Sequence, residues 1–402
     1  GSGGVAAGAG GSAAGAGAGG AGTAAGSGGA AGSKPAAGSG GTLAAGSGGS
    51  AGTPAAGSGG AAPVIPASET VYVSGGGPSI HVFSLATDTG KLTARSTVAA
   101  GENPSYLAIA PDKKHLYAVN EADGPSSKIL AFSIDPSDGH LTPINSASSG
   151  GNGAPHLAVH PSGKWIAVAH YNSGHTTILP VKADGGVGEP IATEQGPMSG
   201  CKNAHQAVFD RSGAHLLVPC LGSNYVIQFN FADGKLTYND PPTVTVPGGP
   251  RHLALDPSES NAYLLSELES KLTWFKYDKT TGKLTAPQTQ NSFKTTAGSS
   301  AHIVVHPAGH WLYLSNRTEN SLGLFSIDGS GKPQPVRFET EMIATPRDFS
   351  VDPFGKYLLL ANQKGSQNVL VYEIAEADGK LTRVQVVPVG DSPTFTTAIT
   401  LP

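Results

Sequence analysis

The sequence predicts an all-β fold made of seven copies of one four-stranded unit. Two short phrases recur along the chain and set the repeat. The glycine of a "DG-K-L-T" phrase returns at intervals of 47 to 49 residues, at Gly90, Gly139, Gly186, Gly234, Gly282, Gly331 and Gly379. A turn phrase of the form "x-P-D/S-x-G-K-x-L-Y" returns at intervals of 46 to 50 residues, at Pro111, Pro161, Arg211, Pro257, Pro307 and Pro353. Seven units of 48 residues span 336 residues, which is the length from Ala67 to Pro402.

Each unit is expected to hold four strands. In residues 105–148 the segments "SYLAIA", "HLYAVN", "KILAFSI" and "LTPINSAS" alternate β-branched or aromatic residues with small or polar ones. Clusters of Pro, Asp and Gly separate them, as expected for turns. No segment carries a convincing helical period. Four strands in about 48 residues, repeated seven times, are typical of a seven-bladed β-propeller.

The two ends of the folded part are expected to close the ring together. The first strand after the tail, Thr70–Ser74, resembles the second strand of a unit, whereas the chain ends with an unpaired first strand, "SPTFTTAIT". The C-terminal strand therefore completes the blade that the N-terminal strand begins. This closure hides two sheet edges that would otherwise invite aggregation.

The first part of the chain has a different composition. All but eight of the residues in Gly1–Ala62 are Gly, Ala or Ser. Such a segment buries too little apolar surface to offset the entropy of ordering, so residues 1–66 are predicted to be a disordered linker or tail, and residues 67–402 the propeller. A tether of this kind suits an exported protein, so we expect an extracytoplasmic location (periplasmic, secreted or lipid-tethered). An interdomain linker has the same composition.

Charge and hydropathy exclude some partners. No run of about 18 apolar residues is present, so no transmembrane segment is expected. The folded part has 24 basic and 29 acidic residues, since Lys34 is the only charged residue of the tail, and no Lys/Arg cluster appears. Nucleic acid is therefore not an expected partner. We expect a monomer.

Two series of residues are expected to meet at one mouth of the channel. The start of strand one and the end of strand two lie at the same end of an antiparallel hairpin. Residues at these positions differ between blades and are mostly polar, which favours an asymmetric ligand over a repeated structural role. The alternative is that no ligand binds there, and that the solvent-filled mouth of the channel simply tolerates any polar residue. The first series is Ser105, His156, His205, Arg251, His302, Arg347 and Thr394, and the second is Glu121, Tyr171, Leu221, Glu267, Arg317, Gln363 and Gly76.

The residue types in these series suit an anionic or carbonyl ligand. Arg251, Arg317 and Arg347 offer planar paired donors for a carboxylate, a phosphate or a developing oxyanion. Glu267 and His205 can accept a proton. Glu267 could instead only neutralise an arginine.

Three phrases resemble the seven-bladed lactonase family: "GGPRHLALDP…AYLLSELES", "SSAHIVVHPAGHWLYLSNRTENSL" and "ATPRDFSVDPFGKYLLLANQ". That family includes propeller-type 6-phosphogluconolactonases and a fungal carboxymuconate cyclase. The resemblance covers the whole folded part. It implies a metal-independent lactone or ester site and catalytic roles for the four residues His205, Arg251, Glu267 and Arg317. His302 stands where bacterial phosphogluconolactonases usually have a carboxylate. The resemblance therefore does not decide whether the substrate is phosphorylated.

No metal or other cofactor is expected. His302, His306 and His310, like His156 and His160, have a spacing that resembles that of metal ligands. Four strand residues, however, cover about 13 Å, whereas zinc ligands lie about 2 Å from the ion.

Cys201 and Cys220 flank one predicted hairpin. A disulfide between them is feasible, and two free thiols remain an alternative.

We therefore predict a hydrolase that opens a sugar-type lactone, with a small anionic or sugar lactone as substrate. Arg251 and Arg317 would stabilise the oxyanion, and either Glu267 or His205 would act as base. Two alternatives remain, a cycloisomerase of the carboxymuconate cyclase type and a non-catalytic exported binding module. The residues expected to shape substrate choice are His156, His302, Arg347, Gln363 and Glu121.

Overall fold

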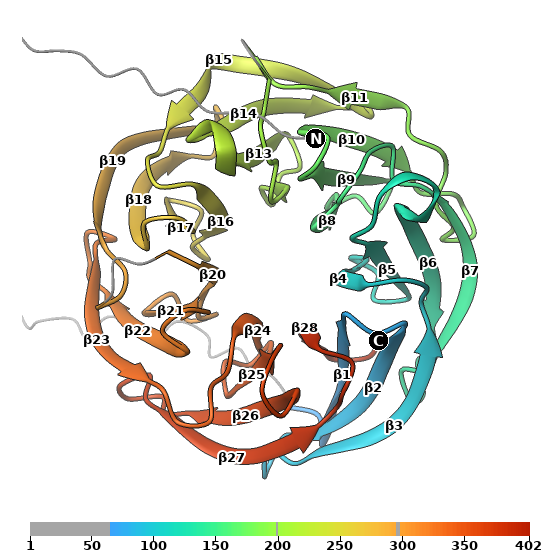
Figure 1. Cartoon of the computed structure of the whole chain (residues 1–402), viewed down its shortest axis with the longest axis vertical. Coiled ribbons are helices and arrows are strands. Elements are labelled where there is room, and N and C mark those ends of the chain that lie inside the picture. Colours follow the sequence, from blue (N-terminus) through green and yellow to red (C-terminus); the bar gives the residue numbers. More distant parts are fainter. Residues whose placement is uncertain (1–64, 198–199, 295–297) are drawn as a thin grey trace, which may run out of the picture. The chain divides into compact units, whose positions relative to one another are not determined.

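The computed structural model describes residues 65–197, 200–294 and 298–402. Seven four-stranded antiparallel sheets surround one axis (Figure 1), so the predicted all-β, seven-bladed propeller is confirmed. The predicted disordered tail falls almost entirely on residues 1–64, which lie outside the described residues. The boundary between residues 66 and 67 stays a prediction, although the first strand begins close to it, at Ser68.

The strands follow each other from the channel outwards within a blade. Blade 1 contains β28 (Pro393–Ile399), β1 (Ser68–Gly75), β2 (Ser79–Ala86) and β3 (Leu92–Ala99). Blade 2 contains β4 (Pro104–Ile109), β5 (His115–Asn120), β6 (Lys128–Ile134) and β7 (Leu141–Ser148), and blade 3 contains β8 (His156–Val159), β9 (Trp165–His170), β10 (His175–Pro180) and β11 (Ala192–Glu194). Blade 4 contains β12 (Val208–Phe209), β13 (His215–Cys220), β14 (Tyr225–Ala232) and β15 (Lys235–Thr245).

The remaining three blades have the same order. Blade 5 contains β16 (Pro250–Leu255), β17 (Asn261–Ser266), β18 (Lys271–Asp278) and β19 (Lys283–Asn291). Blade 6 contains β20 (Ser300–Val305), β21 (Trp311–Asn316), β22 (Ser321–Ile327) and β23 (Pro333–Glu339), and blade 7 contains β24 (Pro346–Val351), β25 (Tyr357–Asn362), β26 (Asn368–Ile374) and β27 (Leu381–Pro388). Two short 3₁₀ helices, η1 (Gly124–Ser126) and η2 (Leu221–Ser223), complete the described elements, and no described helix is long or apolar enough to cross a membrane.

The last strand of the chain closes the ring. β28 pairs antiparallel with β1, with Thr70 opposite Ile399 and Val73 opposite Thr396. The C-terminal strand is therefore the innermost strand of the blade whose other three strands come from the N-terminal side. This is the closure that the sequence predicts.

The hydrophobic core lies between the blades. Each described cluster of buried apolar side chains combines two neighbouring sheets. For example, Ala167 and Ile178 of blade 3 pack with Leu216, Val218 and Phe229 of blade 4. A sheet in this position is covered on both faces, which explains why strand two of most blades is buried along nearly its whole length.

A hydrogen bond repeated between blades explains both sequence phrases. The Tyr72 hydroxyl of blade 1 donates to the Gly139 carbonyl of blade 2 at 2.9 Å, and Tyr263 and Tyr313 donate to Gly331 and Gly379 at 2.8 and 2.7 Å. The accepting glycines have positive φ, a conformation that glycine adopts without steric cost. Where a unit has a tyrosine at this position, its hydroxyl therefore fixes the corresponding turn of the next unit; blades 3 and 4 have Ala167 and Leu217 there instead.

The two cysteines are joined. The Cys201–Cys220 disulfide links the segment before β12 to the end of β13, with the Cα atoms 5.3 Å apart. The backbone N–H of His205 donates to the Pro219 carbonyl just beside it, at 3.0 Å. Of the two alternatives left by the sequence, the structure has the disulfide, and it anchors the irregular segment that carries His205.

Glu69 in β1 should make stability depend on pH. Its side chain is 2% exposed, and neither carboxylate oxygen has a hydrogen-bond partner among the described residues. Burial raises the pKa of Glu69 to about 7; Asp352 adds to the rise and Lys113 opposes it. The folded state thus holds this proton up to a higher pH than the unfolded chain, so stability should fall as pH rises from about 4.5 to 7.

The variant Glu69→Gln should remove this loss. Its melting temperature should exceed that of the wild type at pH 8, and the difference should shrink towards pH 5. Thermal unfolding at both pH values measures it, with Glu373→Gln at an exposed strand position as control. A Glu69→Gln difference that is the same at both pH values would contradict the assignment.

Candidate active site

The two predicted series of residues do lie at one end of each hairpin. In all seven blades the N–H that follows strand two donates to a carbonyl two or three residues before the mouth residue of strand one. Glu267 donates to Gly249 at 2.7 Å, and Arg317 donates to Ser299 at 3.0 Å. The backbone therefore sets the two series side by side, as expected from antiparallel pairing.

A β-bulge at the start of strand one adds a second layer of residues. In blade 5, Pro250 pairs with Ser266 and His252 with Leu265, so Arg251 is an extra residue. Irregularities at the corresponding place occur in blades 1, 2, 6 and 7. A bulge re-aims side chains that strict alternation would send to opposite faces. As a result the consecutive residues Arg251 and His252, like Arg347 and Asp348, line the same small cavity.

Glu267 lies between two arginines at the mouth. Its Oε2 is 2.8 Å from Arg251 Nε, and its Oε1 is 2.7 Å from Arg317 Nη2. Arg251 is 2% exposed and also donates from Nη1 to the Ala301 carbonyl at 2.5 Å. Arg317 donates from Nε to the Ser299 carbonyl at 3.2 Å. Both guanidinium groups are thus fixed from two directions, while Glu267 and Arg317 stay partly exposed.

The surroundings of Arg251 change the pKa of its guanidinium group. Burial lowers the pKa of Arg251 to about 9, the Arg317 charge adds to this lowering, and Glu267 opposes it. Arg251 still carries its proton at neutral pH. The Glu267 carboxylate is therefore what keeps this cation in place, and it leaves the group of three with one net positive charge.

Buried histidines line the channel below the mouth. The imidazole rings pack edge to face around His252. The centre of its ring lies 5.1 Å from that of His205, 5.8 Å from that of His156 and 5.0 Å from that of His302. Burial lowers the pKa of His205, His156 and His252 well below the ordinary value, and lowers that of His302 to about 3. These imidazoles are therefore neutral at pH 7, and His205 Nδ1 has no hydrogen-bond partner among the described residues.

A polar hollow of about 250 Å³ adjoins the arginines. Arg347 Nη2 lies 2.6 Å from Glu121 Oε2 inside it. Tyr171 connects the hollow to the mouth, because its ring meets that of His205 edge to face at 5.7 Å. The lining side chains are mostly amides, hydroxyls and carboxylates, which suits hydroxyl groups of a ligand: Asn103, Glu121, Asp123, Tyr171, Asn172, Arg347 and Gln363.

The predicted residues thus fall into three groups. Arg251, Glu267 and Arg317 form one ion-paired set, and His205 shares a cavity wall with Arg251. Glu121, Arg347 and Gln363 line the adjoining hollow. His156 and His302 lie deeper: His156 stacks against Tyr106 at 4.0 Å between ring centres, and His302 bonds to His252.

Three inner residues, Tyr106, His252 and Asp348, are absent from the predicted site. Each directly follows a residue of the first predicted series in the chain. Regular strand alternation assigns such neighbours to the opposite face, so it does not predict them at the mouth. A usable signal was available, since four of the seven blades have a charged, aromatic or imidazole residue directly after the mouth residue.

Comparison with known proteins decides the family. A family model described as "Lactonase, 7-bladed beta-propeller" matches residues 68–397. The chain belongs to this lactonase family. A curated 6-phosphogluconolactonase of Pectobacterium carotovorum is 31% identical over 340 residues, which cover 83% of this chain and 99% of the relative. That of Bacillus subtilis is 28% identical over 323 residues, covering 77% of this chain and 91% of the relative.

A solved lactonase has the same architecture. The structure of a periplasmic gluconolactonase from Pseudomonas aeruginosa superimposes with a TM-score of 0.76 at 27% sequence identity, covering 83% of this chain and all of that chain. The predicted family is therefore confirmed, and the relatives support the predicted class, a hydrolase of sugar-type lactones.

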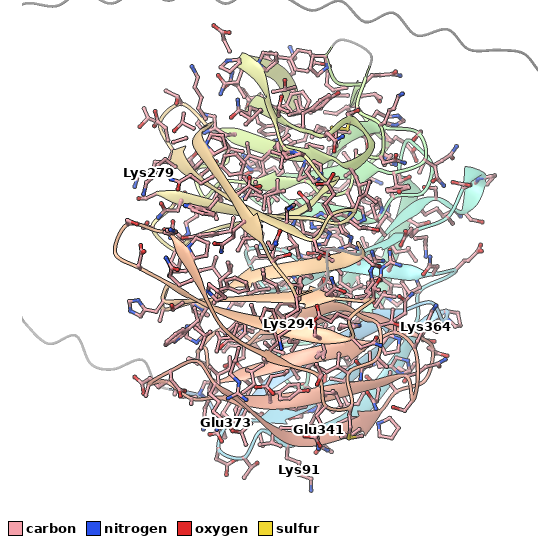
Figure 2. All side chains as sticks on the ribbon, turned by 60° about the vertical axis from the view of Figure 1, so that its left-hand side comes forward. Lys91, Lys279, Lys294, Glu341, Lys364 and Glu373 are labelled. Carbon is pink, nitrogen blue, oxygen red and sulfur yellow. A yellow bond between two sulfur atoms is a disulfide. The ribbon has the colours of Figure 1, made fainter. Side chains whose placement is uncertain are left out.

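The ion-paired group at the mouth should contribute to stability as well as to chemistry. Glu267→Gln leaves the buried Arg251 cation without a carboxylate, and we expect the free energy of unfolding to fall by about 2 kcal/mol. The matched control is Glu341→Gln, whose partner Arg383 lies at 2.7 Å but whose own side chain is 77% exposed. Glu341 follows the outermost strand of blade 6 and lies at the periphery (Figure 2).

Denaturant unfolding of both variants and the wild type measures the difference. The control should change stability by no more than about 1 kcal/mol, as exposed ion pairs do. Equal losses for the two variants would show that Glu267 does not hold Arg251 in the way described.

Proposed function

We propose that the protein hydrolyses a sugar-type lactone at this mouth, with His205, Arg251, Glu267 and Arg317 as its catalytic residues. One observation carries the proposal: two fixed guanidinium groups and a neutral imidazole surround one opening of the channel. Attack of water on a lactone carbonyl needs positive donors for the oxyanion and an acceptor for the proton of water. The named relatives support the same substrate class.

The roles divide by geometry. Some N–H groups of Arg251 and Arg317 are not used in contacts with carbonyl groups or with Glu267. These N–H groups face the carbonyl oxygen of the lactone and stabilise the negative charge that develops on it. Both oxygens of Glu267 already contact these arginines, so Glu267 orients them. His205 is neutral and its Nδ1 is unpartnered, so His205 accepts the proton of the attacking water. The ring opens as the carbonyl re-forms, and the released ring oxygen takes up the proton that His205 accepted from water.

The adjoining hollow would hold the hydroxyl-bearing part of the lactone. Its charged side chains are Arg347, Glu121 and Asp123, and Arg347 is already paired with Glu121. The remaining charge is negative, which favours sugar hydroxyls over a phosphate dianion. We therefore propose an unphosphorylated sugar lactone as the better substrate, with Gln363 and Glu121 among its contacts and His156 and His302 shaping the floor of the site.

We also propose an extracytoplasmic location. The disulfide favours an oxidising compartment. The Gly/Ala/Ser-rich composition of residues 1–62 suits a tether, and the Pseudomonas aeruginosa relative is named as periplasmic. Fractionation of the native host, with the thiols of Cys201 and Cys220 quantified before and after reduction, tests this proposal.

Replacement of the oxyanion donors should lower turnover strongly. With glucono-1,5-lactone and its 6-phosphate as substrates, we expect Arg317→Ala and Arg251→Lys to lower kcat by about 10²–10³-fold, the usual cost of losing one such donor. His205→Gln should lower it comparably. The control Arg383→Ala removes a surface arginine of an ion pair and should stay within twofold of the wild type.

Circular dichroism verifies that each variant is folded. Hydrolysis of the unphosphorylated lactone should be the faster of the two. Unchanged turnover in Arg317→Ala and His205→Gln would remove the proposed chemistry from this mouth.

The pH profile should report His205. A base must be deprotonated to act, and the pKa of His205 lies well below its ordinary value of 6.5 because the ring is buried beside Arg251. The acid limb of kcat/KM should therefore lie below pH 6.5 and disappear in His205→Gln. The limb is measured from values of kcat/KM across the pH range, corrected for spontaneous lactone hydrolysis. A limb at or above pH 6.5, or one that persists in the variant, would exclude His205 as the base.

A further inference from the structure

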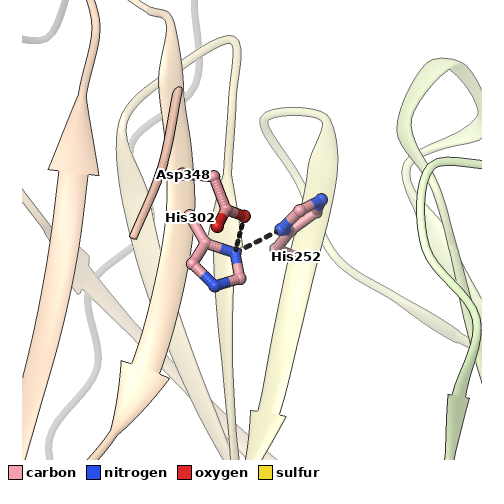
Figure 3. Close-up of side chains that lie close together, drawn as sticks. All are labelled: His252, His302 and Asp348. Atoms are coloured by element: carbon pink, nitrogen blue, oxygen red, sulfur yellow. Dashed lines mark hydrogen bonds and ion pairs between the residues drawn. The ribbon is translucent and has the colours of Figure 1, made fainter. Parts of the chain in front are cut away.

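A group of three buried side chains lies below the mouth; none has a catalytic role in the proposed chemistry, and only His302 belongs to the floor of the proposed site. His252 of β16, His302 of β20 and Asp348 of β24 come from the innermost strands of three consecutive blades (Figure 3). His252 Nδ1 and His302 Nδ1 are 2.7 Å apart, and His302 Nδ1 is 3.3 Å from Asp348 Oδ2. One ligand atom from each residue falls within 4.8 Å of the others. This compact set contains two imidazoles and one carboxylate.

Asp348 lacks the partners that a buried carboxylate needs. The residue is 3% exposed, and neither of its oxygens accepts a well-aligned hydrogen bond from a described residue; the Thr396 backbone N–H and the charges of Arg251 and Arg347 only partly offset the burial that raises the pKa of its carboxyl. Its contact with His302 is an ion-pair distance without a directed hydrogen bond. Buried polar atoms without partners are rare in folded proteins because leaving one unpaired is costly. Glu69 also lacks partners, but it belongs to no cluster of possible ligands among the described residues; at Asp348 the two adjacent imidazoles point to a shared cation.

The nearby arginines do not supply that partner. Arg251 Nε lies 2.8 Å from Glu267, and Arg347 Nη2 lies 2.6 Å from Glu121. Within the described residues, His302 is the only basic group at ion-pair distance from Asp348. The carboxylate of the inner layer is thus available to a cation.

A small cavity reaches the same group. It measures about 10 Å³ and is lined by His252, Asp348 and Ser105 together with Arg251, Arg347 and His205. Four further buried atoms without hydrogen-bond partners belong to its lining residues: Ser105 Oγ, His252 Nε2, His205 Nδ1 and Arg251 Nε, the last of which lies at ion-pair distance from Glu267. A space of this size holds about one water molecule. It could therefore provide a fourth, non-protein ligand next to the three side chains.

We propose that His252, His302 and Asp348 bind one divalent transition metal ion, of the zinc or cobalt type. Nitrogen ligands with one carboxylate favour such ions, whereas calcium and magnesium prefer all-oxygen sites. A water in the cavity completes a four-coordinate ion. Binding requires the two imidazole nitrogens to separate from 2.7 Å to about 3.3 Å, the spacing of tetrahedral ligands about 2 Å from a zinc ion. The sequence predicts no metal site, and the proposal does not depend on lactone hydrolysis.

The rival explanation is a metal-free set that shares protons. In that case Asp348 carries a proton and donates it to His302, and no ion is needed. The two cases differ in one respect that can be measured directly. Only the metal site makes binding of a dication depend on all three side chains.

The test is cobalt binding by the full chain, expressed without a histidine tag and stripped with a chelator. We expect one equivalent of Co²⁺, with the intense visible absorption of a tetrahedral ion, and displacement of it by Zn²⁺. Asp348→Asn, His302→Gln and His252→Gln should each weaken binding by more than about 100-fold, since even residues that only support a ligand change affinity by about 10–100-fold.

The matched control is His306→Gln. His306 follows the same strand as His302 at its other end and bonds to the Gly355 carbonyl at 2.8 Å, so its replacement should leave cobalt binding unchanged. Melting temperatures measured with and without Zn²⁺ provide a second readout, because an ion that binds only the folded state raises them. Absence of stoichiometric binding, or binding that survives Asp348→Asn, would overturn the proposal and support the proton-sharing set. Lactone hydrolysis is tested separately, by the turnover of the Arg317→Ala, Arg251→Lys and His205→Gln variants.

Discussion

The pairing of β28 with β1 is the interaction on which the rest of the molecule depends. Each inner strand holds its mouth residue at a fixed angle around the axis only because the ring is complete. Without the C-terminal strand, blade 1 would lose its innermost strand, and both blade 7 and blade 2 would face an open gap. Arg347 and Glu121 come from these two flanking blades, and their 2.6 Å contact exists only in the closed ring.

Stability and chemistry use the same groups at the mouth. A guanidinium as buried as that of Arg251 is costly unless a counter-charge and carbonyl oxygens surround it. Glu267 and the Ala301 carbonyl provide these contacts, and they also fix the direction of the remaining N–H groups. Donors that are already oriented need no rearrangement when negative charge develops on a substrate.

The sequence was sufficient for the fold and for the outer layer of the site because both follow from the repeat. A period of 48 residues gives the blade count, and antiparallel pairing gives the positions of Arg251, Glu267 and Arg317. The inner layer could not be obtained in this way. His252 and Asp348 reach the channel through bulges, and a bulge depends on local backbone geometry that the repeat does not encode.

The sequence also left alternatives that only side-chain geometry could narrow. It offered Glu267 as a base or as a counter-ion to one arginine, whereas the structure has it contacting two. Such contacts depend on rotamers of long side chains from different blades, and these are set by packing around the ring rather than by any local pattern.

The strand order gives the fold no intrinsic starting point. Thr70 lies opposite Ile399, so the first and last strands of the propeller begin and end side by side. A short peptide could join these neighbouring ends, and new ends could be opened at exposed residues of a turn, such as 328–330 between β22 and β23. Circular permutation would then move the seam to another blade, which would separate the contribution of ring closure from that of the particular residues in blade 1.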